Sequence, residues 1–457
     1  MPMAVSPGAE RARAAAINAR LDGLPGFGLN MMGRIALMLT FLFANYDISV
    51  LTITLPALST DLGLSGLDLS WPVAANLVAY GVGAYICGHI ADRRGRRLGL
   101  GLTILILGIG GVLSAFSWDL VSFTVFRFIT GCGMGAVLAL ATVYLGEFAP
   151  KGRRGRIISQ IYLVQAILLI VIGFVSLPVL DLDGGWRILL GAGGLVLLVL
   201  PLLNDRALME SPRWLAEHAR LDRAEKLTRA IETRMGVTPS AAEQAPPPEE
   251  VGEEATKVPL SALLRKPYAG RLAVSVIFWF AYYVAFYGLN SYMAIILEDL
   301  GVALSDAILI TVITRLTGPI ACILLITVIE RVERRTIIIL GCLAQGIGLA
   351  FLITDLGMGV FTAAMLLYTF AVGIVTPPAF TYTAEMFPTR ARGTAAAIGD
   401  GVGHFGGAIA PFLILPILQS FGGTWTVIAV IACICVAAAA ISAGVRTRNR
   451  ALTEIAA

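Results

Sequence analysis

Four charged side chains lie in the middle of long apolar stretches: Asp47, Arg127, Arg315 and Asp400. If these stretches cross a membrane, each charge costs roughly 3 kcal/mol or more unless it is paired or hydrated, so each is a candidate functional group. Asp400 and His404 are four residues apart and share one face of a helix. A lone histidine such as His404 is more often structural than a proton relay. Arg315 could bind an anionic substrate or pair with Asp400, and both roles stay open.

The elements that hold these charges are predicted to be membrane-spanning helices. The chain has 457 residues, of which 57% are hydrophobic and 14% charged, against about 25% charged in a typical soluble domain. A helix needs roughly 20 apolar residues to cross the hydrocarbon core, and the apolar runs lack the two-residue alternation of strands. Twelve segments qualify: 31–56, 71–91, 98–117, 119–145, 157–180, 186–204, 270–295, 303–329, 336–354, 356–383, 393–418 and 424–445. We therefore expect an all-α membrane protein.

Basic residues are distributed as expected for a polytopic membrane protein. With the N-terminus placed inside, only Arg127, Arg187 and Arg315 of the 34 Lys and Arg residues fall outside the predicted cytoplasmic segments. We therefore expect both termini in the cytoplasm. The predicted regions are an N-terminal tail (1–30), a six-helix bundle (31–204), a cytoplasmic linker that is partly helical and partly disordered (205–269), a second six-helix bundle (270–445) and a C-terminal tail (446–457).

A shift of 238 residues relates the two predicted bundles. It places the loop 92–97 on 330–335, and it places Glu147 on Glu385. Two motifs that obey one offset, with acidic, proline and glycine positions matched, indicate a repeat; a general likeness of basic loops is the alternative. Parallel repeats are typical of transporters in which the substrate binds at the interface between the repeats.

Several motifs together resemble one family of transporters. Residues 88–97 read Gly-His-Ile-Ala-Asp-Arg-Arg-Gly-Arg-Arg, and residues 210–214, after the sixth predicted span, read Glu-Ser-Pro-Arg-Trp. With Arg127 and the charged runs around Glu147 and Glu385, these motifs resemble the major facilitator superfamily, in its sugar-porter, organic-ion and niacin-transporter branch. The resemblance covers nearly the whole chain. It implies the major facilitator fold, with twelve transmembrane helices in two pseudo-symmetric six-helix bundles.

The resemblance also implies a role for the first two intramembrane charges. In the sugar–proton symporters that the chain resembles, an aspartate follows an aromatic residue in helix 1 and pairs with an arginine in helix 4. Tyr46-Asp47 and Arg127 match these positions. We expect protonation to neutralise Asp47 and release Arg127, so that alternating exposure loads and unloads one proton. A static structural ion pair is the alternative. The second half has Ala285 and Met365 at these positions and lacks the pair.

A further group of charges lies at the predicted cytoplasmic helix ends. Arg–carboxylate pairs can be bidentate and geometrically exacting. Such a network could lock the cytoplasmic face when the cavity opens outward and break when it opens inward. The alternative is that these charges only set topology and solvate the loops. We assign to this cytoplasmic gate Gly88, Asp92, Arg93, Gly95, Arg96, Arg97, Glu147, Arg154, Glu330, Arg334, Glu385 and Arg392.

The seventh predicted span is rich in aromatic residues and departs from the sugar-porter pattern. Gly288 and Asn290 match the Gly-x-Asn of those porters, but Val284 and Ala285 replace their two sugar-recognising glutamines. An aromatic cavity containing arginines better suits a small organic or aromatic acid. Packing against lipid and neighbouring helices is the alternative. We assign substrate contact to Tyr46, Tyr162, Gln165, Tyr283, Tyr287, Asn290, Arg315 and Asp400.

Together these features predict a secondary active transporter in a bacterial inner membrane. We expect proton-coupled symport of a small organic solute by alternating access. A facilitator or exporter of the same fold is one alternative, and a solute sensor that does not transport is another. The sequence has no nucleophile–base or metal-ligand constellation, so we predict no enzymatic activity, no metal and no cofactor. The expected partners are the solute, protons and the lipid bilayer, without nucleic acid, and the expected state is a monomer.

Overall fold

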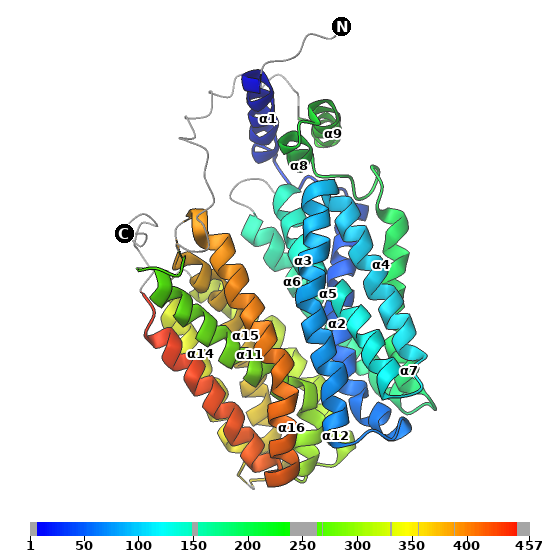
Figure 1. Ribbon diagram of the computed structural model, residues 1–457, viewed down its shortest axis with the longest axis vertical. Coiled ribbons are helices and arrows are strands. Elements are labelled where there is room, and N and C mark those ends of the chain that lie inside the picture. Colours follow the sequence, from blue (N-terminus) through cyan, green and yellow to red (C-terminus); the bar gives the residue numbers. More distant parts are fainter. Residues whose placement is uncertain are drawn as a thin grey trace.

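The computed structural model describes residues 7–148, 154–237, 263–266, 268–329, 331–354, 356–387 and 389–445. Within these ranges the chain is helical, with no strand, and eleven helical segments are long and apolar enough to cross a membrane. The last of these, Ala395–Ser442, contains two crossings, because Gly422 has non-helical φ and ψ of 79° and 179° and the chain turns back there (Figure 1). The predicted spans 393–418 and 424–445 lie on either side of this glycine, so the described part of the chain accounts for twelve crossings.

The first bundle contains the first six spans. Its elements are α2 (Met31–Asp61), η1 (Gly66–Leu69), α3 (Ser70–Arg94), α4 (Arg96–Ala115), α5 (Leu120–Phe148), α6 (Arg154–Leu180), α7 (Gly185–Ala192) and η2 (Gly193–Leu202). The short elements α7 and η2 follow each other without a break and form the sixth span.

The second bundle contains the other six spans. Its elements are α11 (Tyr268–Asp299), α12 (Leu304–Ile313), η4 (Thr314–Leu316), α13 (Thr317–Val328), α14 (Arg334–Leu352), α15 (Met358–Glu385) and α16 (Thr389–Ser442). The span formed by α12, η4 and α13 tightens at Arg315, four residues before Pro319. Proline cannot donate a hydrogen bond to the carbonyl four residues earlier, and its ring crowds that carbonyl. A predicted site residue therefore lies where the helix is irregular.

Glycines bring the helices of the first bundle into backbone contact. A Cβ on Gly83 of α3 would lie 1.8 Å from the carbonyl oxygen of Cys132 in α5, and a Cβ on Gly135 of α5 would lie 1.9 Å from that of Tyr80 in α3. Such approaches are typical of small residues between membrane helices. As a result α3 and α5 form a closely packed unit, and Arg127 projects from it.

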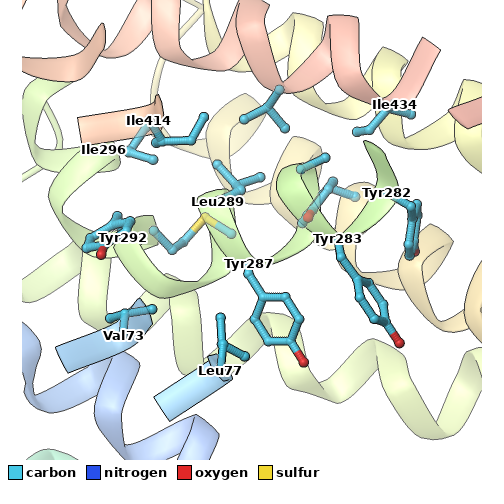
Figure 2. Packing of buried hydrophobic residues seen from close by; sticks show 14 of the residues in the cluster. Val73, Leu77, Tyr282, Tyr283, Tyr287, Leu289, Tyr292, Ile296, Ile414 and Ile434 are labelled. Carbon is cyan, nitrogen blue, oxygen red and sulfur yellow. The ribbon is translucent and has the colours of Figure 1, made fainter. Parts of the chain in front are cut away.

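The two bundles meet along α3 and α16, along α2 and α11, and where α6 faces α12 and α13. Val73 and Leu77 of α3 belong to the same buried cluster as the residues of α11, and Leu77 lies beside Tyr287 (Figure 2). Far from α8 and α9, the Tyr292 hydroxyl of α11 donates to the carbonyl of Leu69 at 3.0 Å. This contact joins the bundles at that end.

A small helical unit covers one end of the first bundle. The region predicted as an N-terminal tail contains α1 (Pro7–Asp22), which packs on α8 (Pro212–Glu217) and α9 (Leu221–Arg234) (Figure 1). Arg20 of α1 pairs with Glu225 at 2.7 Å and with Glu232, which is nearly buried. Residues 238–262, which include the part of the linker predicted to be disordered, lie outside the described residues. We refer below to this side of the molecule as the α8–α9 end.

The Arg20 pairs lead to a prediction about the docking of α1. We expect Arg20→Ala to leave Glu232 buried without its cation, which costs on the order of 3 kcal/mol, and to release α1 from α9. Hydrogen exchange should then show lost protection of the α9 amides. Arg13→Ala is the matched control, because the Arg13–Asp222 pair is 48% and 96% exposed and contributes at most about 1 kcal/mol. Equal exchange in both variants would contradict the docking role of Arg20.

Candidate functional site

A buried ion pair lies inside the first bundle. Nη2 of Arg127 on α5 donates to both carboxylate oxygens of Asp47 on α2, each at 2.6 Å. Arg127 is 0% exposed and Asp47 is 5% exposed. Nε and Nη1 of Arg127 have no hydrogen-bond acceptor among the described residues. One carboxylate therefore holds the guanidinium, and neutralising that carboxylate would leave the arginine without its counter-charge.

The surroundings of this pair are apolar and closed. Asp47 and Arg127 belong to helices of the same bundle and are buried from water in this arrangement. Tyr46 is also buried, and its hydroxyl donates to the Leu189 carbonyl of α7 at 2.6 Å. Adjacent helix residues point in different directions. Asp47 points to α5, so its neighbour Tyr46 points in another direction. That direction is towards α7 of the same bundle and away from the second bundle.

Arg315 of η4 lies between the bundles. Its Nη1 donates to the hydroxyl of Ser49 on α2 at 2.8 Å, whereas Nε is buried without an acceptor in the part of the chain that the structure describes. No described carboxylate lies within 4.0 Å of the guanidinium, so the pairing with Asp400 is not seen here. A partly buried cation that contacts a neutral hydroxyl can accept an anion as its partner.

Three of the predicted substrate residues come together on the interface side of the second bundle. Tyr283 and Tyr287 project from the same side of α11 (Figure 2), and the Tyr283 hydroxyl donates to Oδ1 of Asp400 on α16 at 3.1 Å. The Tyr287 hydroxyl lies 3.4 Å from Nε2 of His404. His404 stacks on Tyr80 of α3, a residue that the sequence gave us no reason to single out. This cluster therefore lies where α3 and α16 meet.

The other predicted substrate residues lie apart from this cluster. Asn290 turns into the second bundle, where its Nδ2 donates to the Tyr368 hydroxyl of α15 at 3.2 Å. Gln165 of α6 is 4% exposed, and its Oε1 has no partner within the described ranges. The side chain of Tyr162 lies outside the described part of the structure.

A neutral network in the second bundle was missed from the sequence. Beside the Asn290–Tyr368 contact between α11 and α15, Nε2 of Gln345 on α14 donates to the Tyr282 hydroxyl at 3.2 Å, and that hydroxyl lies 3.4 Å from Thr376. The shift of 238 residues relates α11 and α15 to α2 and α5, the helices of the ion pair. A glutamine inside an apolar span was the available signal.

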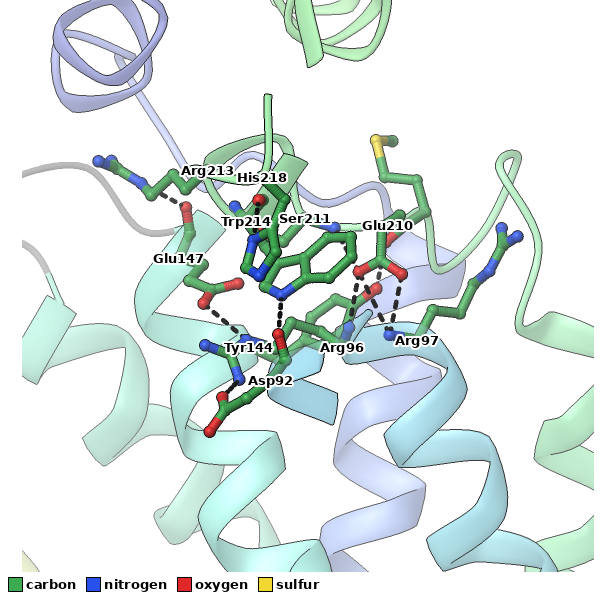
Figure 3. Close-up of polar contacts among 11 residues, drawn as sticks. Asp92, Arg96, Arg97, Tyr144, Glu147, Glu210, Ser211, Arg213, Trp214 and His218 are labelled. Carbon is green, nitrogen blue, oxygen red and sulfur yellow. Dashed lines mark hydrogen bonds and ion pairs between the residues drawn. The ribbon is translucent and has the colours of Figure 1, made fainter. Parts of the chain in front are cut away.

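Four of the gate residues predicted in the first bundle take part in one network at the α8–α9 end: Asp92, Arg96, Arg97 and Glu147. Arg96 donates through Nε to Glu147 at 3.1 Å and also pairs with Asp92 (Figure 3). Nε1 of Trp214 donates to the Asp92 carbonyl at 2.8 Å, and Arg97 pairs with Asp205 at 2.6 Å. Burial raises the pKa of Glu147, although Arg96 opposes the shift. The network holds α3, α4, α5 and α8 together.

Glu210 is a central acceptor of this network that we did not assign to the gate. Its carboxylate accepts the backbone N–H groups of Arg96 at 2.9 Å, Ser211 at 3.0 Å and Arg97 at 3.3 Å (Figure 3). Gly95 makes room for it: φ is +123°, and a Cβ there would lie 2.3 Å from Oε2 of Glu210. The signal was the motif at 210–214, whose acid follows the last span of the first bundle.

The second bundle carries its own gate contact, and Arg334 donates to Glu385 at 3.2 Å. Arg93 is exposed, and an added Cβ on Gly88 would meet no atom within 4 Å. Glu330 lies outside the described residues, as do the side chains of Arg154 and Arg392. Among the gate residues that are described, no ion pair joins the two bundles. The bundles can therefore separate at this end without breaking any of the described ion pairs.

Comparison with known proteins matches the chain to one large family. The profile of the Major Facilitator Superfamily matches residues 37–411, and a second, overlapping match covers residues 280–454. The niacin transporter NiaP of Acinetobacter baylyi is 26% identical over 91% of this chain and 94% of its own length. The glucose transporter GlcP of Staphylococcus epidermidis is 29% identical over 91% of this chain and 94% of its own length.

A solved structure shows the same fold. The inward-open conformation of the xylose transporter XylE from Escherichia coli superposes with a TM-score of 0.73, over 92% of this chain and 98% of that chain, at 22% identity. The fold is thus the twelve-helix, two-bundle arrangement that the sequence predicts.

The geometry at Gly95 generates a prediction for the gate network. We expect Gly95→Ala to strain the backbone by about 1–3 kcal/mol and to displace the carboxylate of Glu210 from its three N–H donors. The purified protein should then unfold at a lower temperature in a thermal-shift measurement. Gly88→Ala is the control, because an added methyl group has open space there. If Gly95→Ala melts with the wild type, the cradle around Glu210 contributes nothing measurable.

Proposed function

Because the chain belongs to the Major Facilitator Superfamily, we propose that it is a proton-coupled symporter of a small organic or aromatic acid. It is a multi-pass membrane transporter of small solutes, like its relatives. The observation that carries the proposal of coupling is the buried Asp47–Arg127 pair, in which both carboxylate oxygens accept from one guanidinium nitrogen at 2.6 Å.

The coupling step follows from the hydrogen bonds of Arg127. When a proton binds to Asp47, the carboxylate loses its charge and Arg127 loses its counter-ion. Nε and Nη1 already lack acceptors among the described residues, so the buried guanidinium gains by moving towards another acceptor. Release of the proton restores the pair. A cycle that exposes Asp47 first to one side and then to the other carries one proton across.

Movement of the bundles supplies the change of exposure. In this arrangement contacts such as Tyr292–Leu69 join the bundles far from α8 and α9, whereas the described gate pairs at the α8–α9 end stay within single bundles. We propose that the opposite arrangement brings the Asp92–Arg96–Glu147 network against the Arg334–Glu385 pair. The regions 31–204 and 270–445 then move as two units, and the linker 205–269 connects them.

Arg315 and the aromatic cluster favour an acid as the solute. Arg315 has a buried N–H without an acceptor and no described carboxylate partner. Tyr283 and Tyr287 supply ring faces on the same interface. Relatives are named for niacin and for glucose, so similarity alone does not choose between acid and sugar. Val284 and Ala285, in place of the glutamines expected of a sugar porter, favour the acid.

The proposed setting is a bacterial inner membrane, with both termini in the cytoplasm and the chain acting as a monomer. Proton-independent uptake would instead identify a facilitator. Binding of solute to reconstituted protein without any uptake would identify a sensor.

The first prediction of the proposed function concerns Asp47. We expect Asp47→Asn to abolish solute accumulation driven by an imposed pH gradient in proteoliposomes, because the amide cannot take up and release the proton. Exchange of labelled for unlabelled solute should persist. Asp61→Asn is the matched control on the same helix, since Asp61 pairs with Arg187 at an exposed helix end. Undiminished accumulation by Asp47→Asn would reject Asp47 as the coupling acid.

The second prediction of the proposed function concerns Arg315. We expect Arg315→Gln to weaken the apparent affinity for carboxylic acids at least about tenfold, the effect of losing one hydrogen bond to a charged group. Arg315→Lys should retain part of the affinity, because it keeps the charge. The measurement is competition of benzoate-type acids, polyols and cations with a transported label. An equal loss for neutral and acidic competitors would show that Arg315 has a structural role and does not recognise the anion.

A further inference from the structure

His404 lies where α16 of the second bundle meets α3 of the first. Its ring stacks on the ring of Tyr80, with the centroids 4.0 Å apart and the planes 9° from parallel. The histidine is 6% exposed. A titratable ring therefore forms part of the contact between the two bundles.

The hydrogen bonds of this ring identify its neutral tautomer. Nδ1 lies 3.0 Å from the carbonyl oxygen of Asp400, which can only accept, so Nδ1 carries the hydrogen. Nε2 is then the acceptor for the Tyr287 hydroxyl at 3.4 Å. Tyr283 stands edge-on to the ring at 4.8 Å. The titratable groups that face His404 are thus Asp400 on its own helix, Tyr283 and Tyr287 on α11, and Tyr80 on α3.

We propose that His404 is a second proton-binding group of the transport cycle, separate from Asp47. The proton binds at Nε2, and the Tyr287 hydroxyl turns from donor to acceptor. The imidazolium then has the Asp400 carboxylate 3.5 Å from Nδ1 and lies flat over the electron-rich face of Tyr80. Both contacts are stronger for the charged ring than for the neutral ring.

Protonation of His404 therefore stabilises the contact between α3 and α16 as this structure has it. In this arrangement the described gate pairs do not join the bundles. Closing that end requires the helices to rock, which tilts the two rings away from parallel and weakens the interaction of the cation with the ring face. Low pH thus holds the transporter in the present arrangement by a route that does not involve Asp47. This inference rests on the proposed function, because it assumes that the bundles move during transport.

The first measurement asks whether His404 binds a proton. The chain has only three histidines, His89, His218 and His404, so protein labelled with ¹³C-histidine gives few ring signals in nanodiscs. His89→Gln and His218→Gln assign two of them by their loss. We expect the His404 signal to shift between about pH 5 and about pH 8.5, as a titrating imidazole does.

The second measurement asks whether that proton acts on the contact between the bundles. Solute exchange is followed in Asp47→Asn protein, which lacks the first proton site. We expect exchange to be at least about twofold slower at about pH 5.5 than at about pH 8, the lower end of the effect of one cation–π contact. Adding His404→Gln or Tyr80→Leu should remove this difference. Adding His218→Gln should keep it, because His218 stacks on Trp214 at the α8–α9 end, away from the contact between α3 and α16.

Two results would overturn the proposal: a His404 signal that is constant over this pH range, or a pH dependence that survives both His404→Gln and Tyr80→Leu. If His404→Gln fails to fold, Tyr80→Leu still decides, because it removes the stacked ring from the other bundle. Failure of the coupling role of Asp47 is separately visible as gradient-driven accumulation by Asp47→Asn. The titration of His404 does not depend on that outcome.

Discussion

A charge inside an apolar slab must keep its partner or lose its charge, and this constraint governs the first bundle. Arg127 cannot deprotonate, so the state of the site depends on Asp47. The close approach of α3 and α5 through Gly83 and Gly135 fixes the position of the guanidinium, and α2 brings the carboxylate to it. In the proposed cycle, motion of the bundles changes the access of protons to that carboxylate.

The two halves share a plan but use different chemistry at equivalent helices. The first bundle joins α2 and α5 by an ion pair, whereas the second joins α11 and α15 through Asn290 and the Tyr368 hydroxyl. A proton on Asp47 would remove the charge that holds the first contact, whereas the amide and phenol groups of the second contact have no carboxylate to neutralise. The contact between the equivalent helices is therefore ionic in one half and neutral in the other.

The sequence predicted most of the fold and only part of the site. Apolar run length and the placement of Lys and Arg depend on the membrane alone, so the spans could be predicted. The resemblance to sugar–proton symporters predicted the pairing of Asp47 with Arg127. Side-chain direction depends on packing that no local pattern encodes. Tyr46 therefore turned to Leu189, and Asn290 turned into its own bundle. Tyr80 was missed because an aromatic residue in an apolar helix looks like any other until the second bundle supplies His404.

The docking of α1 has a consequence for biosynthesis. Arg20 meets Glu232 across a separation of 212 residues, and all six spans of the first bundle lie between them. At about 5–20 residues per second, the ribosome delivers the glutamate roughly 10–40 s after the arginine. Until then α1 lacks α9, one of the two helices on which it packs. The docking of α1 on α9 can therefore form only after all six spans of the first bundle have been synthesised.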